Sequence, residues 1–441
     1  MAKTFTSFNP SDGQVVGRYP IFTAKEVAHT VEQARAASDE WVKLGFSGRK
    51  KVLLNWSTFI INNVEQIAQL ISLETGKPLS DSRLEVSNTV NHIGWAARHA
   101  EEIMRTSHRA PGALMANMSA TVERSPLGVV GVIGPWNYPI FTPMGSIAYA
   151  LAAGNTVVFK PSEYTPGVGM WIHESFNSIA PFSGVFTTIT GLADTGNALC
   201  TSAINKLSFT GSTRTAKLVA AACATQMTPV VLECGGKDPV IVASDANIER
   251  AVDASIWSAM ANAGQSCIGA ERVYVDEKIA DIFIEKAIAL ASTLKAGAPG
   301  EGNYGASTMP SQIGVITSHV KAAIKDGGKF AYGSLKSIQE PFVQPVILVD
   351  VPENSTAVRE ETFGPIIIIN RVASMKQAIE LANDSRYGLG ANIWSKRQGK
   401  KIASQLHCGM VAINSTFSFA AVPSVPFGGV KDSGYGRVHG P

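Results

Sequence analysis

The sequence predicts an α/β protein with a doubly wound parallel sheet, a second α/β domain and a small β-hairpin. Two observations predict this fold class. Short apolar runs alternate with helical patterns from residue 129 onward, at the spacing of βαβ units. In addition, 441 residues are more than one hydrophobic core usually holds, so two domains are expected.

The residues before 129 are expected to supply helices that pack on a larger body. Residues 1–20 suggest a loose entry with short strands, and residues 106–117 are rich in turn formers. Residues 120–124 alternate like a short exposed strand. Apolar residues recur at helical spacing, with one polar face, in three segments: 24–41, 50–73 and 84–104.

The doubly wound sheet is predicted from five strands in alternation with four helices. The expected strands are 129–133, 156–159, 185–189, 206–209 and 229–232, and the helices between them are 143–153, 168–179, 194–201 and 213–224. No charged residue occurs in 127–159, but three prolines interrupt this run. We therefore interpret the run as buried strands, a turn and a helix rather than as a membrane span.

A second α/β region is expected after Glu233. Its expected strands are 240–242, 272–275, 346–349, 366–369 and 411–413, its helices include 247–262 and 279–294, and residues 296–309 form a Gly-rich loop. The hinge between the two regions falls near Gly235 and Gly236. Glu233 and Cys267 therefore flank an expected interdomain cleft, where ligand sites are common.

Composition excludes several classes of protein. An apolar content of 45% and a charged content of 17% are typical of an ordinary globular protein. A net charge of +3 gives no reason to expect a nucleic-acid or membrane partner. Five cysteines without a C-x-x-C pair indicate neither a disulfide framework nor a metal site. Reduced thiols, and an N-terminus without the apolar core of a signal peptide, favour a cytoplasmic protein.

The chemistry is expected at Cys267, which follows a long helical pattern within Gly-Gln-Ser-Cys. A Cys thiolate attacks electrophilic carbon well, and a carboxylate such as Glu233 can activate water to release the covalent product. The alternative is a buried structural cysteine, which is the common fate of a free thiol. The presence of further motifs in the same chain favours the catalytic interpretation.

Three further strand ends carry groups suited to a dinucleotide. Gly211 and Ser212 follow a strand and open a helix, where backbone N–H groups favour a pyrophosphate. Lys160 and Glu163 end another strand and can hold ribose hydroxyls; Glu163 would repel a 2′-phosphate, which favours NAD over NADP. Asn137 closes the first strand and could donate its amide to an oxyanion, although Asn is also an ordinary turn former.

Together these segments resemble the NAD(P)-dependent aldehyde dehydrogenase superfamily, from about Pro126 to Arg437. Seven motifs carry the resemblance in the order usual for the family. They are P-W-N-Y-P (135–139), K-P-S-E (160–163), F-T-G-S-T (209–213), L-E-C-G-G-K (232–237), G-Q-S-C (264–267), E-E-T-F-G-P (360–365) and P-F-G-G-V-K-D-S-G (426–434).

The resemblance implies a role for each site residue. Cys267 is the nucleophile and Glu233 the general base, and Asn137 forms the oxyanion hole with the backbone N–H of Cys267. The implied cofactor residues are Lys160 and Glu163 at the adenosine ribose, Gly211 and Ser212 at the pyrophosphate, Glu361 at the nicotinamide ribose, and Trp136 and Phe363 along the cofactor path.

The implied activity is oxidation of a small-molecule aldehyde to a carboxylic acid. The cofactor is NAD, with NADP also possible, and the steps pass through a cysteine thiohemiacetal and a thioester that water hydrolyses. The implied domains are a Rossmann-like cofactor domain (1–107 and 127–234), an oligomerisation hairpin (108–126), a catalytic domain (235–425) and a return segment (426–441).

Members of the family usually continue beyond such a return segment into a strand of the oligomerisation sheet. We therefore expect a truncated C-terminus, an unpaired edge near residues 120–124, and a homodimer or homotetramer only if that strand is dispensable. Two alternatives remain open: a catalytically silent or impaired truncated member, and a cysteine hydrolase without cofactor. The aldehyde is not specified, since semialdehydes and aromatic aldehydes fit alike and no Arg can be placed as a carboxylate clamp.

Overall fold

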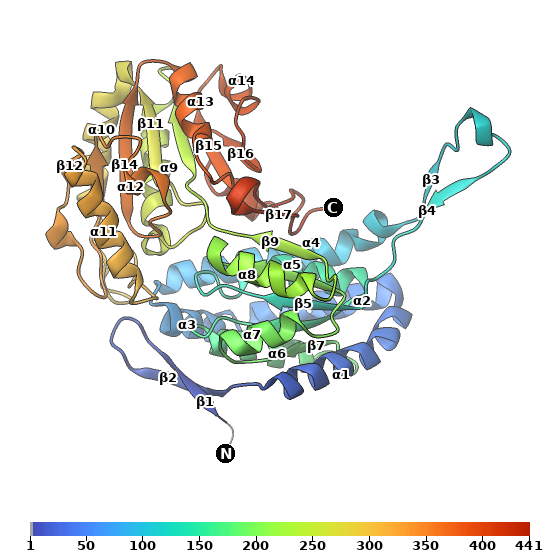
Figure 1. Cartoon of the computed structure of the whole chain (residues 1–441). Helices are drawn as coiled ribbons and strands as arrows, with labels where there is room; N and C mark the ends of the chain where they lie inside the picture. The colour runs from blue at the N-terminus through green and yellow to red at the C-terminus, as the bar shows by residue number, and fades with distance from the viewer. Residues whose placement is uncertain (1–2) are drawn as a thin grey trace.

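A computed structural model describes residues 3–441 as two lobes, each built on its own sheet (Figure 1). The first lobe has a six-stranded sheet in the order β17-β9-β8-β5-β6-β7. Its strands are β5 (Val129–Ile133), β6 (Thr156–Lys160), β7 (Phe186–Thr188), β8 (Lys206–Thr210), β9 (Val230–Glu233) and β17 (Gly434–Tyr435). Strands β5 to β9 pair in parallel, whereas β17 returns from the end of the chain to pair antiparallel with β9.

Helices surround this sheet and bury its apolar faces. They are α1 (Ala24–Lys43), α2 (Gly45–Asn62), α3 (Val64–Thr75), α4 (Leu79–Met104), α5 (Phe141–Ala153), α6 (Pro166–Asn177), α7 (Ala193–Cys200) and α8 (Thr213–Ala224). Buried aromatic rings fill the core between sheet and helices; the rings of Trp56 and Phe176 meet edge to face at 5.1 Å. Because both faces of the sheet are buried, the strand segments are continuous apolar runs in the sequence.

The single helix expected over residues 50–73 is in fact two helices, α2 and α3. They separate at Asn63, whose φ of −115° and ψ of 21° are not helical. The Asn63 side chain donates to the carbonyl of Phe59 at 2.8 Å. Asn competes for backbone hydrogen bonds in this way, which ends a helix even where the apolar periodicity continues.

The second lobe has a seven-stranded sheet in the order β12-β13-β14-β11-β10-β15-β16. Its strands are β10 (Pro239–Val242), β11 (Arg272–Asp276), β12 (Lys329–Tyr332), β13 (Val346–Val349), β14 (Ile366–Val372), β15 (Gly390–Trp394) and β16 (Met410–Ile413). The covering helices are α9 (Ile248–Met260), α10 (Glu277–Ala291), α11 (Gln312–Lys325), α12 (Thr356–Arg359), α13 (Met375–Asn383), α14 (Gly399–Ala403) and α15 (Ser418–Ala421). All pairs are parallel except β12 with β13.

Strands β12 and β15 were not expected from the sequence. Strand β15 begins with Gly390 and carries the fully buried Asn392, so it lacks a continuous apolar run. Strand β12 is a half-exposed edge strand, where burial does not impose an apolar pattern. Strand β15 is fixed by pairing with β10 and β16, and β12 by pairing with the next strand, β13.

Two hairpins lie outside the main sheets. Strands β1 (Thr4–Phe8) and β2 (Val15–Pro20) pair at the N-terminal side, and β3 (Ser107–Arg109) pairs with β4 (Ala120–Val122). The β3–β4 hairpin projects away from both lobes (Figure 1). The residue pattern of 106–117 predicted turns, whereas the family resemblance implied a hairpin over 108–126; strand β3 pairs with the strand expected at 120–124. The described residues also contain four short 3₁₀ helices: η1 (Ala113–Met115), η2 (Ala261–Gly264), η3 (Leu335–Ser337) and η4 (Lys431–Ser433).

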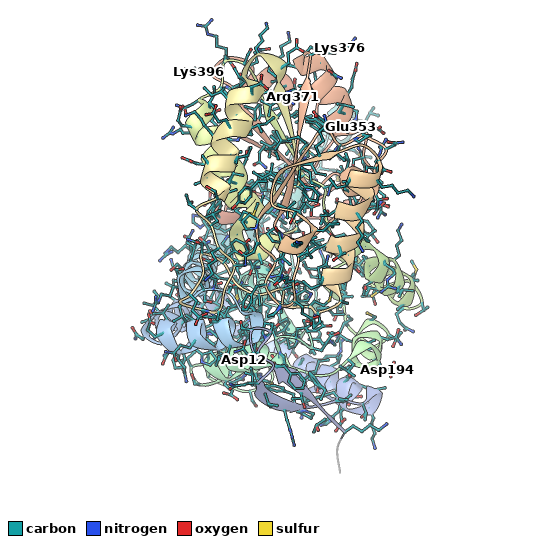
Figure 2. The ribbon with its side chains drawn as sticks, turned by 90° about the vertical axis from the view of Figure 1, so that its left-hand side faces the viewer. Asp12, Asp194, Glu353, Arg371, Lys376 and Lys396 are labelled. Carbon is teal, nitrogen blue, oxygen red and sulfur yellow. The ribbon has the colours of Figure 1, made fainter. Side chains whose placement is uncertain are left out.

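Charged side chains cover the outside of the lobes. Figure 2 shows Lys376 and Lys396 at the far end of the second lobe, whereas Asp12 and Asp194 belong to the first. The chain passes from the first sheet to the second between Glu233 and Pro239, and β17 returns beside β9. Within residues 3–441, no helix combines the length and the apolar character needed to cross a membrane.

Candidate active site

Cys267 is placed by a strained turn at the end of α9. Asn262 and Ala263, in η2, have left-handed φ values of 53° and 56°, and Gly264 follows with φ of 69°. A Cβ on Gly264 would lie 2.2 Å from the Gly364 backbone, so only glycine fits there. The turn ends the helix and leaves the Cys267 thiol partly exposed at the wall of a cavity. Strain of this kind is often found at functional sites.

Asn137 is tied to the loop that carries this cysteine. Its amide Nδ2 donates to the backbone carbonyl of Gln265 at 2.9 Å, and its own backbone carbonyl accepts from Asn262 Nδ2 at 2.9 Å. Lys77 Nζ donates to the same carbonyl at 2.7 Å. One N–H of the Asn137 amide is used by Gln265, which leaves the other for an oxyanion near Cys267.

Glu233 reaches the same cavity from the other lobe. It is the last residue of β9, its side chain is 2% exposed, and both carboxylate oxygens are buried without a hydrogen-bond partner in the described chain. Burial raises the pKa of Glu233 to about 7, although the nearby side chains of Cys267 and Thr210 act to lower it. A carboxylate that titrates near neutral pH and lacks partners is suited to accept a proton from water or a thiol.

The Cys267 thiol is not activated by a fixed cation. Burial is the largest cause that raises its pKa above the usual range, and the negative charges of Glu233 and Glu361 raise it further. The resting thiol is therefore protonated at neutral pH. A base that lines the same cavity, which Glu233 does, can remove this proton when an electrophile arrives.

The cavity between the lobes has a volume of about 360 Å³ and is walled mostly by apolar and aromatic side chains. Cys267 and Glu233 line it, and its walls include Tyr138, Phe141 and Phe427. Tyr138 and Phe141 follow the oxyanion candidate Asn137 by one and four positions. A cavity of this size and polarity holds a small organic molecule.

The expected cofactor groups lie at neighbouring strand ends of the first sheet. Lys160 ends β6 and is 5% exposed; its Nζ donates to the Pro161 carbonyl at 3.1 Å, which leaves N–H groups for a ligand. Glu163 is exposed just beyond it. Gly211 follows β8, and Ser212 caps the twelve-residue helix α8 by accepting from the N–H of Thr215.

Glu361, Phe363 and Trp136 lie where the second lobe faces these strand ends. Glu361 Oε1 accepts from the backbone N–H of Gly236 at 3.0 Å, and burial raises the pKa of Glu361 to about 8. A Cβ on Gly235 would lie 2.2 Å from Glu361 Oε2, so this approach requires glycine. Phe363, with φ of 53°, meets the ring of Trp136 edge to face at 5.6 Å.

Two buried ion pairs that support these residues were missed at the sequence level. Lys237 Nζ pairs with Glu271, and the carboxylate of Glu271 accepts from the backbone N–H groups of Thr362 (2.8 Å) and Phe363 (2.9 Å). The second pair, Lys77 with Glu85 at 2.7 Å, holds the turn that carries Asn137. The sequence offered Lys237 at the end of the L-E-C-G-G-K motif and Glu271 beside an apolar strand, but no spacing pairs the two residues.

The structure thus brings Cys267 and Glu233 to one cavity, with Asn137 against the cysteine loop. The cofactor candidates form a separate group at the ends of β6 and β8 and in the segment that carries Glu361. Within residues 3–441, no cluster of three or more His, Cys, Asp or Glu side chains could hold a metal ion.

Comparison with known proteins gives consistent similarities. The model of the aldehyde dehydrogenase family matches residues 1–441. The chain is 34% identical to 4,4'-diapolycopene aldehyde oxidase of Methylomonas sp, over 99% of this chain and 83% of that protein. It is also 34% identical to the succinate-semialdehyde dehydrogenase [NADP(+)] GabD of Escherichia coli, over 97% and 89%. Lactaldehyde dehydrogenase from Escherichia coli superimposes with a TM-score of 0.95 at 30% identity, covering 100% of this chain and 93% of that one.

Proposed function

The chain belongs to the aldehyde dehydrogenase family, and from this membership we propose a covalent mechanism centred on Cys267. In this proposal an aldehyde is oxidised to a carboxylic acid with NAD(P)⁺ as the oxidant. The observation that carries the proposal is that Cys267 and Glu233, from different lobes, line one cavity. A nucleophile and a base that share a cavity are the groups that a two-stage acyl mechanism requires.

Three features of the first lobe fit a nicotinamide dinucleotide. The N-terminus of α8 behind Ser212 favours a pyrophosphate. The spare N–H groups of Lys160 and the exposed carboxylate of Glu163 suit ribose hydroxyls. Glu361, held by Gly236, is proposed to bind the nicotinamide ribose, and Trp136 and Phe363 to border the ring. When bound, the cofactor supplies the hydride acceptor.

The first half of the proposed reaction takes place on Cys267. Glu233 accepts the proton of the Cys267 thiol, and the thiolate adds to the aldehyde carbon to give a thiohemiacetal. The oxyanion that forms is held by the Asn137 amide and by the backbone N–H of Cys267. Oxidation then leaves an acyl thioester on Cys267.

The second half releases the acid. Glu233 first releases the thiol proton to solvent and then accepts a proton from water, and the resulting hydroxide attacks the thioester carbonyl. The C–S bond breaks to give the acid and the Cys267 thiolate, which regains a proton from Glu233. A base with a pKa of about 7 favours hydrolysis over acyl transfer to a thiol acceptor, because water needs a base and a thiolate does not. We therefore propose that the product is the free carboxylic acid.

We further propose that the exposed hairpin is an oligomerisation element of a homodimer or homotetramer. Leu114 is 97% exposed at its tip, and Met115 and Met118 are more than half exposed, which is unusual for large apolar side chains that have no partner. Residues 1–107 with 127–234 are proposed as the cofactor domain and 235–425 as the catalytic domain. The five free thiols favour a cytoplasmic location. Light scattering, which measures the molar mass in solution, tests this role of the hairpin. The parent chain should have the mass of a dimer or tetramer, and the Leu114→Glu variant a lower mass.

A panel of aldehydes with NAD⁺ or NADP⁺ tests the activity. The proposal predicts reduced cofactor and one equivalent of acid for each aldehyde consumed, read at the nicotinamide absorbance band. Acid formation without cofactor reduction would instead indicate a cofactor-free cysteine enzyme.

A further inference from the structure

We propose that the substrate is an uncharged aldehyde with a largely apolar body, and that the cavity excludes aldehydes carrying a second, anionic group. This inference rests on the proposed function, because it concerns the same cavity. It separates the chain from an enzyme such as a succinate-semialdehyde dehydrogenase, whose substrate carries a carboxylate. The argument depends on the charges that line the cavity and on what each of them already contacts.

Most of the wall area of the cavity comes from apolar and aromatic side chains. Leu84 and Trp257 are 52% and 48% exposed and therefore lie at the mouth, whereas Phe427 is 8% exposed and lies deeper. The rings of Trp257 and Phe417 meet edge to face at 5.0 Å. Such walls stabilise an apolar substrate body by removing its surface from water.

Among the described residues that line the cavity, the one lysine is Lys77 and none is arginine. Lys77 is 1% exposed, and its Nζ donates to Glu85 Oε2 and to the Asn137 carbonyl, each at 2.7 Å. The same ammonium lies 4.3 Å from the centre of the Tyr138 ring. The charge of Lys77 is thus already neutralised by Glu85, two of its N–H groups are engaged, and the Tyr138 ring covers the ammonium, which disfavours binding of a substrate carboxylate.

The two histidines of the cavity add no positive charge at neutral pH. Burial lowers the pKa of His92 to about 4 and that of His439 to about 3. The ring nitrogens of His92 lie 3.2 Å from the Tyr149 hydroxyl and 3.2 Å from the Ala420 carbonyl, so both are also engaged. Neither histidine offers an ammonium-like partner to an anion.

The remaining charge in the cavity is negative. Glu85 is compensated by Lys77 and by the backbone N–H groups of Ile140 and Phe141, at 3.0 and 3.2 Å. Asp81 lines the cavity but forms no ion pair within the described chain. Burial raises the pKa of Asp81, which indicates that the surroundings already disfavour one negative charge. A carboxylate on the substrate would be desolvated there without a cation and close to Asp81.

A matched pair of aldehydes tests this inference. Benzaldehyde and 4-carboxybenzaldehyde share one skeleton and differ in a single carboxylate. We expect kcat/KM to be about 100-fold or more higher for benzaldehyde, since a polar group without a partner in a site is rejected by such factors. Equal efficiency, or a preference for the carboxylated aldehyde, would overturn the inference while leaving the proposed function in place.

If neither aldehyde is oxidised, the proposed function fails, and binding then decides the inference separately. Benzyl alcohol and 4-(hydroxymethyl)benzoate are unreactive analogues that also differ by a single carboxylate. Binding of each is measured as an increase in the Tm of the protein. Stabilisation by the alcohol alone supports an uncharged ligand. Stabilisation by the benzoate, by both equally, or by neither would overturn it.

Two substitutions on one helix provide the matched variants. Asn88 lines the cavity, whereas Asn91, one turn further along α4, is exposed and does not. Asn88→Arg introduces the missing cation and should raise kcat/KM for 4-carboxybenzaldehyde at least tenfold relative to benzaldehyde. Asn91→Arg adds the same charge outside and should leave the ratio unchanged. Equal ratios in both variants and the parent would contradict the electrostatic explanation.

Discussion

Glu233 and Cys267 line one cavity although they belong to different lobes. Glu233 ends β9 of the six-stranded sheet, and Cys267 follows α9 of the seven-stranded lobe. Neither lobe alone contains both groups. The proposed chemistry therefore depends on how the lobes are joined by the short passage from Glu233 to Pro239 and by the return of β17 beside β9.

Removal of the proposed nucleophile should abolish oxidation without loss of cofactor binding. In Cys267→Ala the cavity keeps its shape, and none of the proposed dinucleotide contacts involves the thiol. Nicotinamide fluorescence titration and steady-state turnover measure the two properties. Cys408→Ala is the matched control, because Cys408 is also partly exposed but lies outside the cavity. Turnover near the parent rate in Cys267→Ala would contradict the assignment.

The rate of deacylation should follow the titration of Glu233. Burial raises the pKa of Glu233 to about 7, and the deprotonated form is the one that accepts a proton from water. Turnover limited by hydrolysis should therefore rise as pH increases through about 7 and level off above it. The pH–rate profile of Glu233→Gln should lack this rise. If the variant shows the same rise near pH 7, another group is responsible for it.

NAD should be preferred over NADP, because the exposed Glu163 carboxylate would lie near the ribose 2′ position. Glu163→Ser should lower the ratio of kcat/KM with NAD⁺ to kcat/KM with NADP⁺ by about tenfold. The substitution removes one unfavourable contact between the carboxylate and the 2′-phosphate. Glu101→Ser removes an exposed carboxylate on α4 and serves as the control. A parent enzyme that uses NADP equally well would be the contrary result.

Breaking the Lys237–Glu271 pair should weaken cofactor binding and stability together. Lys237 is 2% exposed, and its partner Glu271 holds the backbone of Thr362 and Phe363 beside Glu361. Lys237→Met leaves a buried carboxylate without its cation, which costs about 3–5 kcal/mol. Denaturant unfolding and the KM for NAD⁺ measure the two effects. An unchanged KM in a destabilised variant would limit Lys237 to a structural role.

The regular part of the fold could be predicted because burial leaves a local pattern. Strands β5, β6, β8 and β9 are buried on both faces, and their apolar runs specify them. Strand β15 could not be predicted, because Gly390 and the buried Asn392 interrupt its pattern and only its neighbours β10 and β16 fix it. The break at Asn63 depends on a side-chain hydrogen bond that competes with the helix periodicity.

The candidate site was predicted from motifs, whereas its electrostatics were not. The residues Cys267, Glu233 and Asn137 stand in short recognisable segments. The charge balance of the cavity depends on Lys77, Asp81, Glu85 and the two histidines, which are far from those segments in sequence. Whether Lys77 is free or engaged is decided by distances to Glu85 and Asn137, and no spacing in the sequence encodes them.

The central claim, a covalent acyl intermediate on Cys267, is tested most directly by trapping it. Glu233→Gln retains the shape of the side chain but cannot accept a proton, so formation of the Cys267 thiolate and hydrolysis of the thioester should both slow, and a thioester that forms should persist. After mixing this variant with NAD⁺ and benzaldehyde, intact-mass and peptide spectrometry should find a benzoyl group that accumulates slowly on Cys267, in step with the NADH formed. NADH formation without acylation of Cys267, or acylation of another residue, would contradict the account.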